Sequence, residues 1–233
     1  MRSLLLSLSA IALLSQSPVL LAQNMAAQNM VAQNTPPVLK KTTPEHKAIA
    51  AAKPAPSKNY KLSGSPTAPI TIEVYTDYEC PSCRLLYLQT LPDLQTQYVA
   101  TGKVQLLHRD FPLPQHNFSK VAARWANAAG QLGKYEIVAN QLFKTQGDWS
   151  QNGNIEAQVA KVLDAGDVAK LREMVKSDTH LDDTVTADVA QANRDALNQT
   201  PTMIVVAKGK RQKIDGMVPF PILKSYIDQQ LAK

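Results

Sequence analysis

Residues 68–83, APITIEVYTDYECPSC, join a short apolar run to a pair of cysteines. The run before the cysteines is rich in β-branched and aromatic residues and begins in a turn-forming GSPTAP stretch, which predicts a strand. After the cysteines, RLLYLQTLPDLQTQYV has leucines and tyrosines at helical spacing, although Pro92 requires a kink or a restart of that helix. The cysteines are therefore expected at a strand-to-helix junction.

Cys80 and Cys83 are the two cysteines of the chain, and such a pair is a structural clip, half of a zinc site or a redox pair. Pro81 suits the first helical position, because its missing N–H would have no partner there. Cys80 then lies at the N-terminus of the helix, with Cys83 one turn further on the same face. The unpaired N–H groups of a helix N-terminus favour a thiolate, which is the attacking species in disulfide exchange.

Charged neighbours of the pair act in opposite directions. Arg84 adds to the stabilisation of a thiolate, whereas Asp77 and Glu79 oppose it. We expect the pKa of Cys80 to lie below the roughly 8.5 of a free thiol and above the roughly 3.5 of the strongest oxidants.

The N-terminal region predicts export. Residues 1–22 carry Arg2, an apolar run over residues 4–14 and a small-residue cleavage site at Ala22, which together indicate a signal peptide. An uncleaved anchor is the alternative, but polar residues interrupt the apolar stretch well short of the roughly 20 residues of a membrane span. Residues 23–58 hold AQN repeats and a Pro/Ala/Lys-rich stretch, the composition of a flexible tether. We expect a periplasmic or otherwise extracytoplasmic protein, whose folded domain spans residues 59–233 and works where disulfides persist.

The charge of the chain lies mainly outside this domain. The net charge is +6, of which residues 1–58 hold +5 and residues 59–233 hold +1. The excess is the solvated basic end of the chain, with weak attraction to an anionic membrane surface as the alternative. No nucleic-acid partner is expected.

The rest of the chain predicts an α/β domain. A second apolar strand is expected at GKVQLLHRDF, and residues 117–197 are mostly helical. A hairpin around Lys-Gly-Lys is expected where IVVAKGKRQKI alternates, and a closing helix at PFPILKSYIDQQLA. Helical spacing and aromatic character predict that the following residues of the helical stretch face the core: Val121, Trp125, Ala128, Leu132, Tyr135, Val138, Leu142, Trp149, Ile155, Val159 and Val162.

The chain resembles the DsbA-like branch of the thioredoxin superfamily over nearly all of residues 60–233. The resemblance is carried by GSPTAPITIEVYTDYECPSC, HRDFPLPQH, AARWANAAGQLGKYE and the TPT at residues 200–202. It implies an α/β, thioredoxin-like fold with a helical insertion, and thiol-disulfide exchange on exported proteins. It also implies that reduced exported proteins are the substrates, that a membrane quinone-linked oxidase reoxidises the dithiol, and that no metal or organic cofactor is needed. We expect a monomer.

The resemblance assigns roles to single residues. Cys80 corresponds to the exposed nucleophile and Cys83 to the buried resolving thiol. Pro201 corresponds to a proline held in cis beside the active site, and Thr200 before it offers backbone groups to an extended substrate. An X-Pro bond carries only a modest cis penalty, so a cis Thr200–Pro201 bond is physically admissible.

Two positions depart from the family pattern. Val74 stands where the family often has a buried acid that accepts the proton of the resolving thiol, and Glu73 lies one place earlier, on the opposite face of the strand. Ser82 stands where the best-known strong oxidants have His, so it brings a hydroxyl but no charge. We therefore expect a milder oxidant.

A zinc site would draw on Cys80, Cys83, His108 and His116, but the chain lacks the second close-spaced ligand pair of common structural sites. We expect the two histidines to be a strand residue and a loop residue near the active face rather than catalysts.

Two functional alternatives stay open. A tethered chaperone or peptide-binding module would make the cysteine pair incidental. A reductase or isomerase would use the same fold, but isomerases of this superfamily commonly carry a separate dimerisation domain, for which residues 23–58 are a poor candidate. An oxidase is therefore preferred.

Overall fold

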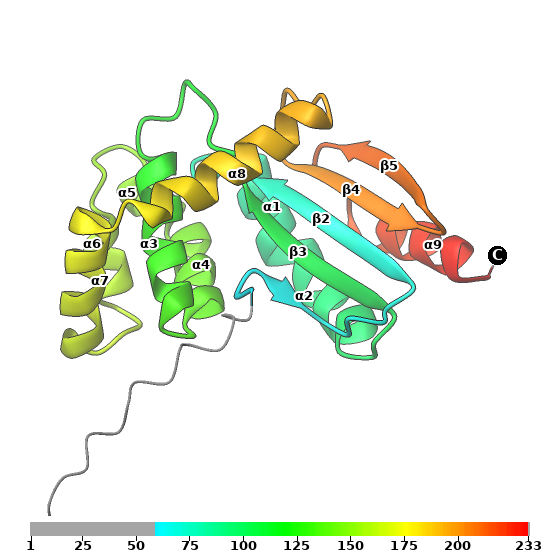
Figure 1. Cartoon of the computed structure of the whole chain (residues 1–233), viewed down its shortest axis with the longest axis horizontal. Helices are drawn as coiled ribbons and strands as arrows, with labels where there is room; N and C mark the ends of the chain where they lie inside the picture. Colours follow the sequence, from blue (N-terminus) through cyan, green and yellow to red (C-terminus); the bar gives the residue numbers. More distant parts are fainter. Residues whose placement is uncertain (1–58, 233) are drawn as a thin grey trace, which may run out of the picture. The chain divides into compact units, whose positions relative to one another are not determined.

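The computed structural model describes residues 59–232, so the expected signal peptide and tether lie outside the described residues. The described part contains one mixed sheet, in the order β1-β3-β2-β4-β5, with helices packed against it (Figure 1). Its strands are β1 (Leu62–Ser63), β2 (Ile70–Thr76), β3 (Val104–Asp110), β4 (Thr202–Ala207) and β5 (Lys210–Asp215). β2 and β3 are parallel and the other neighbours are antiparallel. The expected strands and hairpin are confirmed.

The helical elements follow the chain in two groups. Between β2 and β3 lie α1 (Pro81–Leu85), the π-helical turn η1 (Leu86–Thr90), α2 (Leu91–Leu94) and the π-helical turn η2 (Gln95–Val99). Between β3 and β4 lie α3 (Ser119–Gln131), α4 (Tyr135–Lys144), α5 (Gln146–Trp149), α6 (Ile155–Val159), α7 (Ala165–Ser177) and α8 (His180–Arg194). The second group is the expected helical insertion, and α9 (Phe220–Ala232) is the expected closing helix.

The helix after the cysteines continues past Pro92 through a change of winding. Pro92 has no N–H to donate, and its ring would collide with the carbonyl four residues earlier in a regular α-helix. The preceding turn η1 widens to π geometry, in which the N–H of Leu91 reaches the carbonyl of Leu86. The predicted interruption is therefore a π-helical turn followed by α2.

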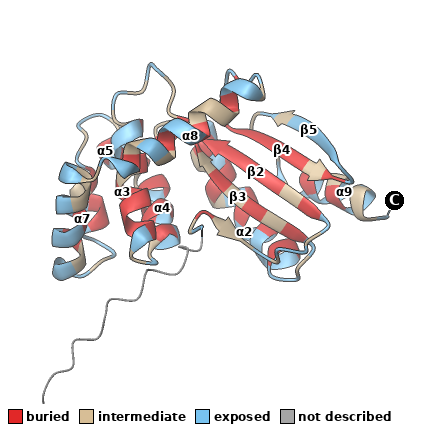
Figure 2. Ribbon diagram, in the orientation of Figure 1, coloured by how far each residue is buried: buried red, intermediate tan, exposed pale blue. Residues whose placement is uncertain are grey.

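The two faces of the sheet have different coverings. Ile70, Ile72 and Val74 of β2 belong to one buried cluster with α1, α2 and α9, whereas Tyr75 belongs to a second cluster with Ala192 of α8. In Figure 1, α8 passes in front of the sheet and α1, α2 and α9 lie behind it. Figure 2 shows the central strands buried and β5 exposed.

Most apolar residues of the insertion belong to the same buried cluster as those of the sheet, with two exceptions to the sequence expectation. Trp125 and Trp149 are buried, as predicted. Val121 and Val162 were predicted to face the core, and this is wrong: they are 40% and 36% exposed. Val121 lies in α3 and Val162 in the turn after α6, and helical spacing alone does not reveal that these two side chains stay uncovered.

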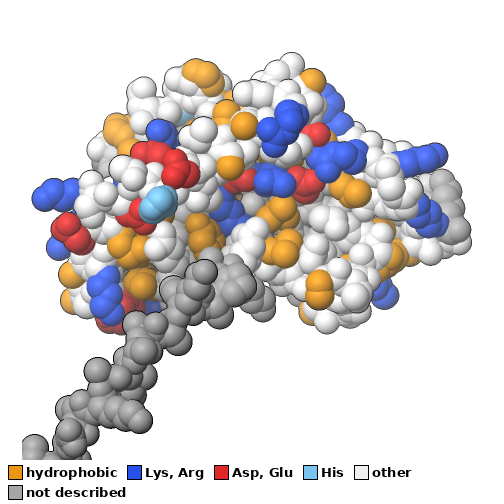
Figure 3. All heavy atoms as spheres, in the orientation of Figure 1, with side chains coloured by type: hydrophobic (Ala, Val, Ile, Leu, Met, Phe, Trp, Pro, Cys, Tyr) orange, Lys and Arg blue, Asp and Glu red, His pale blue; other side chains and the backbone are white. Residues whose placement is uncertain are grey.

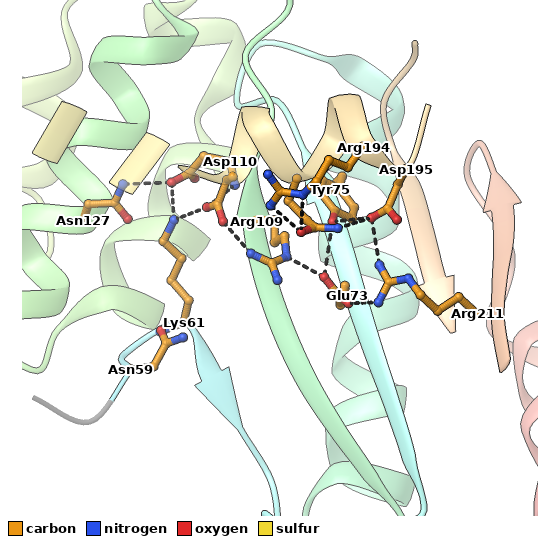
Figure 4. Close-up of polar contacts among 12 residues, drawn as sticks. Asn59, Lys61, Glu73, Tyr75, Arg109, Asp110, Asn127, Arg194, Asp195 and Arg211 are labelled. Carbon is orange, nitrogen blue, oxygen red and sulfur yellow. Dashed lines mark hydrogen bonds and ion pairs between the residues drawn. The ribbon is translucent and has the colours of Figure 1, made fainter. Parts of the chain in front are cut away.

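An ion-pair network covers the α8 face of the sheet (Figure 4). Lys61 contacts Asp110 at 2.5 Å and Asp188 of α8 at 2.6 Å. Asp188 also contacts Arg109, which in turn contacts Glu73 at 2.5 Å. Figure 3 shows acidic and basic side chains next to one another on this face rather than a large patch of one sign. The network therefore gives α8 polar contacts to β3, and Arg109 extends them to Glu73 of β2.

Among residues 59–232, no helix has the length and apolar character that crossing a membrane requires.

Candidate active site

Cys80 and Cys83 lie where the sequence predicts, at the junction of β2 and α1. Cys80 is the N-cap of α1 with extended backbone angles of φ −73° and ψ 120°, and Pro81 begins the helix. Cys83 is fully buried, at 0% exposure. Cys80 was expected to be exposed, but it retains only 7% exposure, because Thr200 and the helix N-terminus close around its sulfur. Pro81 and Ser82 are exposed beside it.

The cysteines are both free thiols, and each sulfur has a backbone partner. The Cys80 Sγ–H donates to the carbonyl of Thr200 at 3.4 Å, and the N–H of Asp77 donates to Cys83 Sγ at 3.4 Å. The Thr200–Pro201 peptide bond is cis, as the resemblance implies, and Pro201 is buried. The structure thus brings the TPT segment, some 120 residues away in sequence, against the first cysteine.

The surroundings of Cys80 lower its pKa to about 6. The largest cause is a hydrogen bond from the Cys83 thiol, which outweighs the opposing effect of burial; the Thr200 side chain and the backbone N–H groups of Cys83 and Ser82 add to it. The pKa lies in the range predicted from the sequence. The contribution of Ser82 comes from its backbone N–H, which any residue except proline would supply at this position.

The surroundings of Cys83 raise its pKa well above the ordinary value of a thiol. Burial is the largest cause, followed by its hydrogen bond with Cys80 and the charge of that thiolate. Arg84, expected to stabilise the thiolate, instead donates from Nε to the carbonyl of Phe143 at 3.1 Å. Hydrogen bonds from Cys83, from Thr200 and from the helix N-terminus, rather than neighbouring side-chain charges, are the leading favourable causes of the low pKa of Cys80.

Asp77 and Glu79 hold the loop that follows β3 against the active-site segment. The Asp77 carboxylate is fully buried and accepts from the N–H of Leu113 at 2.6 Å, and it lies 2.8 Å from Nδ1 of His116. The Glu79 carboxylate accepts from the N–H of Phe118 at 2.6 Å. His116 is thus a loop residue near the active site, as predicted, and its partner is Asp77.

The insertion also contacts the active-site segment through residues that the sequence analysis did not identify. Ser119 Oγ accepts from the N–H of Tyr78 at 3.2 Å, and Gln146 Nε2 donates to the carbonyls of Tyr78 and Cys80. A serine and a glutamine inside helical stretches carry no motif that would reveal these contacts.

The position of the family's buried acid is apolar here. Val74 is fully buried on the face of β2 that contacts α1, and its register partner in β3 is His108. His108 is a buried strand residue, as predicted, and burial lowers its pKa. Glu73 points to the opposite face, where it contacts Arg109 and Arg211.

The zinc alternative gains no support from the geometry. Within residues 59–232, no three His, Cys, Asp or Glu side chains are grouped so as to hold a metal ion.

The family model described as thioredoxin matches residues 57–229. The chain is similar to the solved structures of Wolbachia pipientis α-DsbA1, with a TM-score of 0.62 and 21% identity over 73% of this chain and 89% of that one. It is also similar to Pseudomonas aeruginosa DsbA2, with a TM-score of 0.59 and 26% identity over 76% of this chain and 96% of that one. The chain belongs to the thioredoxin family, and its architecture is that of the DsbA-like thiol-disulfide oxidoreductases.

Sequence relatives fall into two groups. A probable disulfide bond formation protein D from Bacillus cereus is 28% identical over 180 residues, covering 73% of this chain and 78% of that protein. Na⁺/H⁺ antiporter NhaA 1 from Mycobacterium sp. strain KMS is 29% identical over 172 residues, but the match spans only 27% of the antiporter's length.

Proposed function

We propose that this protein is an exported thiol-disulfide oxidase, which introduces disulfides into secreted or periplasmic proteins through Cys80 and Cys83. The observation that carries the proposal is the opposite shift of two pKa values within one pair: the pKa of Cys80 falls to about 6, and that of Cys83 rises. A stabilised thiolate at Cys80 favours the reduced form of the pair, and a pair whose reduced form is favoured is an oxidant.

The reaction begins with the Cys80–Cys83 disulfide. A substrate thiolate attacks Cys80 Sγ, the disulfide bond breaks, and Cys83 leaves with the electron pair and takes up a proton. A second substrate thiolate then attacks the substrate sulfur of the mixed disulfide and releases Cys80 as a thiolate. The substrate has lost two electrons and gained a disulfide, and the protein holds the two electrons as its dithiol.

The remaining site residues support these steps. Cys80 is a good leaving group in the second step because its thiolate is stabilised. Pro81 and Ser82, which are both exposed, flank Cys80 on the side from which a substrate segment approaches in this proposal. Thr200 and Pro201 form the opposite wall, where backbone groups pair with an extended substrate segment.

The cellular setting is part of the same proposal. Residues 1–22 direct export and residues 23–58 tether the domain of residues 59–233, which acts as a monomer outside the cytoplasm. A membrane quinone-linked oxidase accepts the electrons of the dithiol. The name of the Bacillus cereus relative, a probable disulfide bond formation protein, supports this direction of electron flow.

The test is oxidation of a reduced, unfolded protein whose activity requires disulfides. We expect the oxidised protein to restore that activity stoichiometrically, and the double variant Cys80→Ser/Cys83→Ser to restore none. Equal recovery with the double variant, in which dissolved oxygen is the remaining oxidant, would show that the cysteine pair is not needed and would favour the chaperone alternative. No recovery with the parent, together with rapid reduction of a disulfide-bonded protein by the dithiol form, would establish a reductase.

A further inference from the structure

Gln146 connects the helical insertion to the active-site segment through a single amide group. Its Nε2 donates to the carbonyl of Tyr78 at 2.7 Å and to the carbonyl of Cys80 at 3.1 Å. Gln146 is the first residue of α5 and is 6% exposed. An amide NH₂ carries two hydrogens, one for each carbonyl, which neither a carboxylate nor an apolar side chain can supply.

The carbonyl of Cys80 is important because of the position of this residue in the helix. As the N-cap of α1, Cys80 directs its carbonyl toward the N–H of Arg84, which donates to it at 3.1 Å in the first helical hydrogen bond. The second bond, from Gln146, further restricts the direction of this carbonyl and therefore the backbone angle ψ of Cys80. The same angle decides where the N–H groups of Ser82 and Cys83 lie relative to the Cys80 sulfur.

The insertion holds Tyr78 from both sides of its backbone. Its N–H donates to Ser119 of α3, its carbonyl accepts from Gln146 of α5, and its ring stacks on Phe143 of α4 with centroids 4.7 Å apart. Gln146 is itself fixed, because fully buried Trp149 in the same short helix donates from Nε1 to the carbonyl of Leu142 at 2.9 Å. Residues 78–80 are thus bound to the insertion by directional contacts.

We propose that Gln146 is a positioning residue for thiol-disulfide exchange: it orients the carbonyl of Cys80, and with it the N–H groups that stabilise the Cys80 thiolate. The inference deepens the proposed function, since it names the residue through which the insertion adjusts the redox strength of the cysteine pair. Gln146 acts through the backbone and does not touch the reacting sulfur atoms.

The test uses Gln146→Met, which has similar volume and no donor. We expect the affinity of the Cys80 thiolate for a proton to rise about tenfold, one pKa unit, when thiolate absorbance is followed against pH in the reduced full chain. The equilibrium constant with glutathione should move toward the disulfide form in the same variant. Gln146→Asn keeps the amide but cannot span both carbonyls, so it should shift the Cys80 titration and the glutathione equilibrium in the same direction by less. If Gln146→Met does not fold, Gln146→Asn is the variant that tests the proposal.

Gln158→Met is the matched control. Gln158 is also a buried glutamine of the insertion, 5% exposed, but its side chain accepts from Lys161 within its own segment. We expect it to lose stability without a change in the thiolate titration. An unshifted titration in a folded Gln146 variant, or an equal shift in Gln158→Met, would overturn the inference.

The two proposals fail separately. The thiolate titration needs no substrate protein, so an unshifted midpoint rejects the role of Gln146 and leaves the oxidase assignment intact. If the parent fails to oxidise protein thiols while Gln146→Met shifts the titration, the proposed function is wrong and the positioning role holds.

Discussion

Glu73 accepts a hydrogen bond from Nε of Arg109 at 2.5 Å, on the face of the sheet opposite Cys83. Its second oxygen accepts from Arg211 at 2.7 Å, so both oxygens of the carboxylate are engaged in ion pairs. Glu73 is therefore part of the polar contacts between α8, β3 and β5, and it is not a proton acceptor for the resolving thiol.

Replacing Glu73 separates these two roles. Glu73→Gln removes a buried charge that pairs with half-buried Arg109 and with exposed Arg211. We expect the free energy of unfolding to fall by about 2 kcal/mol. Urea unfolding measures this loss, and the thiolate titration of Cys80 should not move. The control Glu156→Gln breaks a more exposed pair with Arg172 and should cost less. A shifted Cys80 titration in Glu73→Gln would contradict the assignment.

The sequence predicted the parts of the site that depend on local order. Cys80, Pro81 and Cys83 fall at the strand-to-helix junction because a β-branched run, a proline and a helical pattern follow one another along the chain. The opposite orientation of Glu73 and Val74 was also predictable, since adjacent residues of a strand point to opposite faces.

The parts it did not predict depend on contacts between distant segments. The contact of Gln146 with Cys80 joins residues 66 positions apart, and the contact of His116 with Asp77 joins residues 39 apart. Neither follows from periodicity. Val121 satisfies the helical pattern but is exposed, because helical spacing does not say which side of α3 the neighbouring helices cover.

Thr200 offers a second way to alter the thiolate. Its side-chain hydroxyl is buried beside Cys80 and, by hydrogen bonding to the Cys80 sulfur, is among the groups that lower the pKa of Cys80. Thr200→Val removes the hydroxyl at nearly constant volume, so the pKa of Cys80 should rise. Thr202→Val is the control, because its hydroxyl bonds to the carbonyl of Gln199 instead. An equal effect of both variants would show that the titration reports only general loosening of the site.

Trapping experiments distinguish the two thiols. Incubated with a disulfide-bonded substrate protein, reduced Cys83→Ala should accumulate a mixed disulfide: the Cys80 thiolate attacks the substrate disulfide and displaces one substrate thiolate, and the intramolecular thiol that could release the bound substrate is gone. Cys80→Ala should trap nothing, since Cys83 is fully buried. Non-reducing electrophoresis after acid quenching compares the two variants, and equal trapping by both would refute the division of labour.

The stability of the reduced form should depend on pH. The pKa of Cys80 in the folded reduced form is about 6, below the roughly 8.5 of an unfolded thiol. The ionised thiolate therefore contributes fully to the free energy of unfolding above pH 8.5, and this contribution is lost as the pH falls through 6. Cys83, with its raised pKa, stays a thiol throughout this window. The reduced form should gain about 3 kcal/mol relative to the oxidised form between these limits. Urea unfolding of both forms across pH measures the difference; a difference that is flat or falls with rising pH disagrees with the stabilised thiolate.

The reduction potential of the Cys80–Cys83 pair tests the oxidase assignment most directly. Strong oxidants of this superfamily lie near −120 mV and thioredoxin lies near −270 mV. The Cys80 thiolate is stabilised by hydrogen bonds and lacks the histidine of the strongest oxidants, so we expect a potential between these limits, and Ser82→His should raise it. Equilibration with glutathione buffers, followed by quantification of free thiols, gives the value. A potential between the limits agrees with an oxidase, whereas a potential as low as that of thioredoxin would contradict it and assign the protein as a reductase.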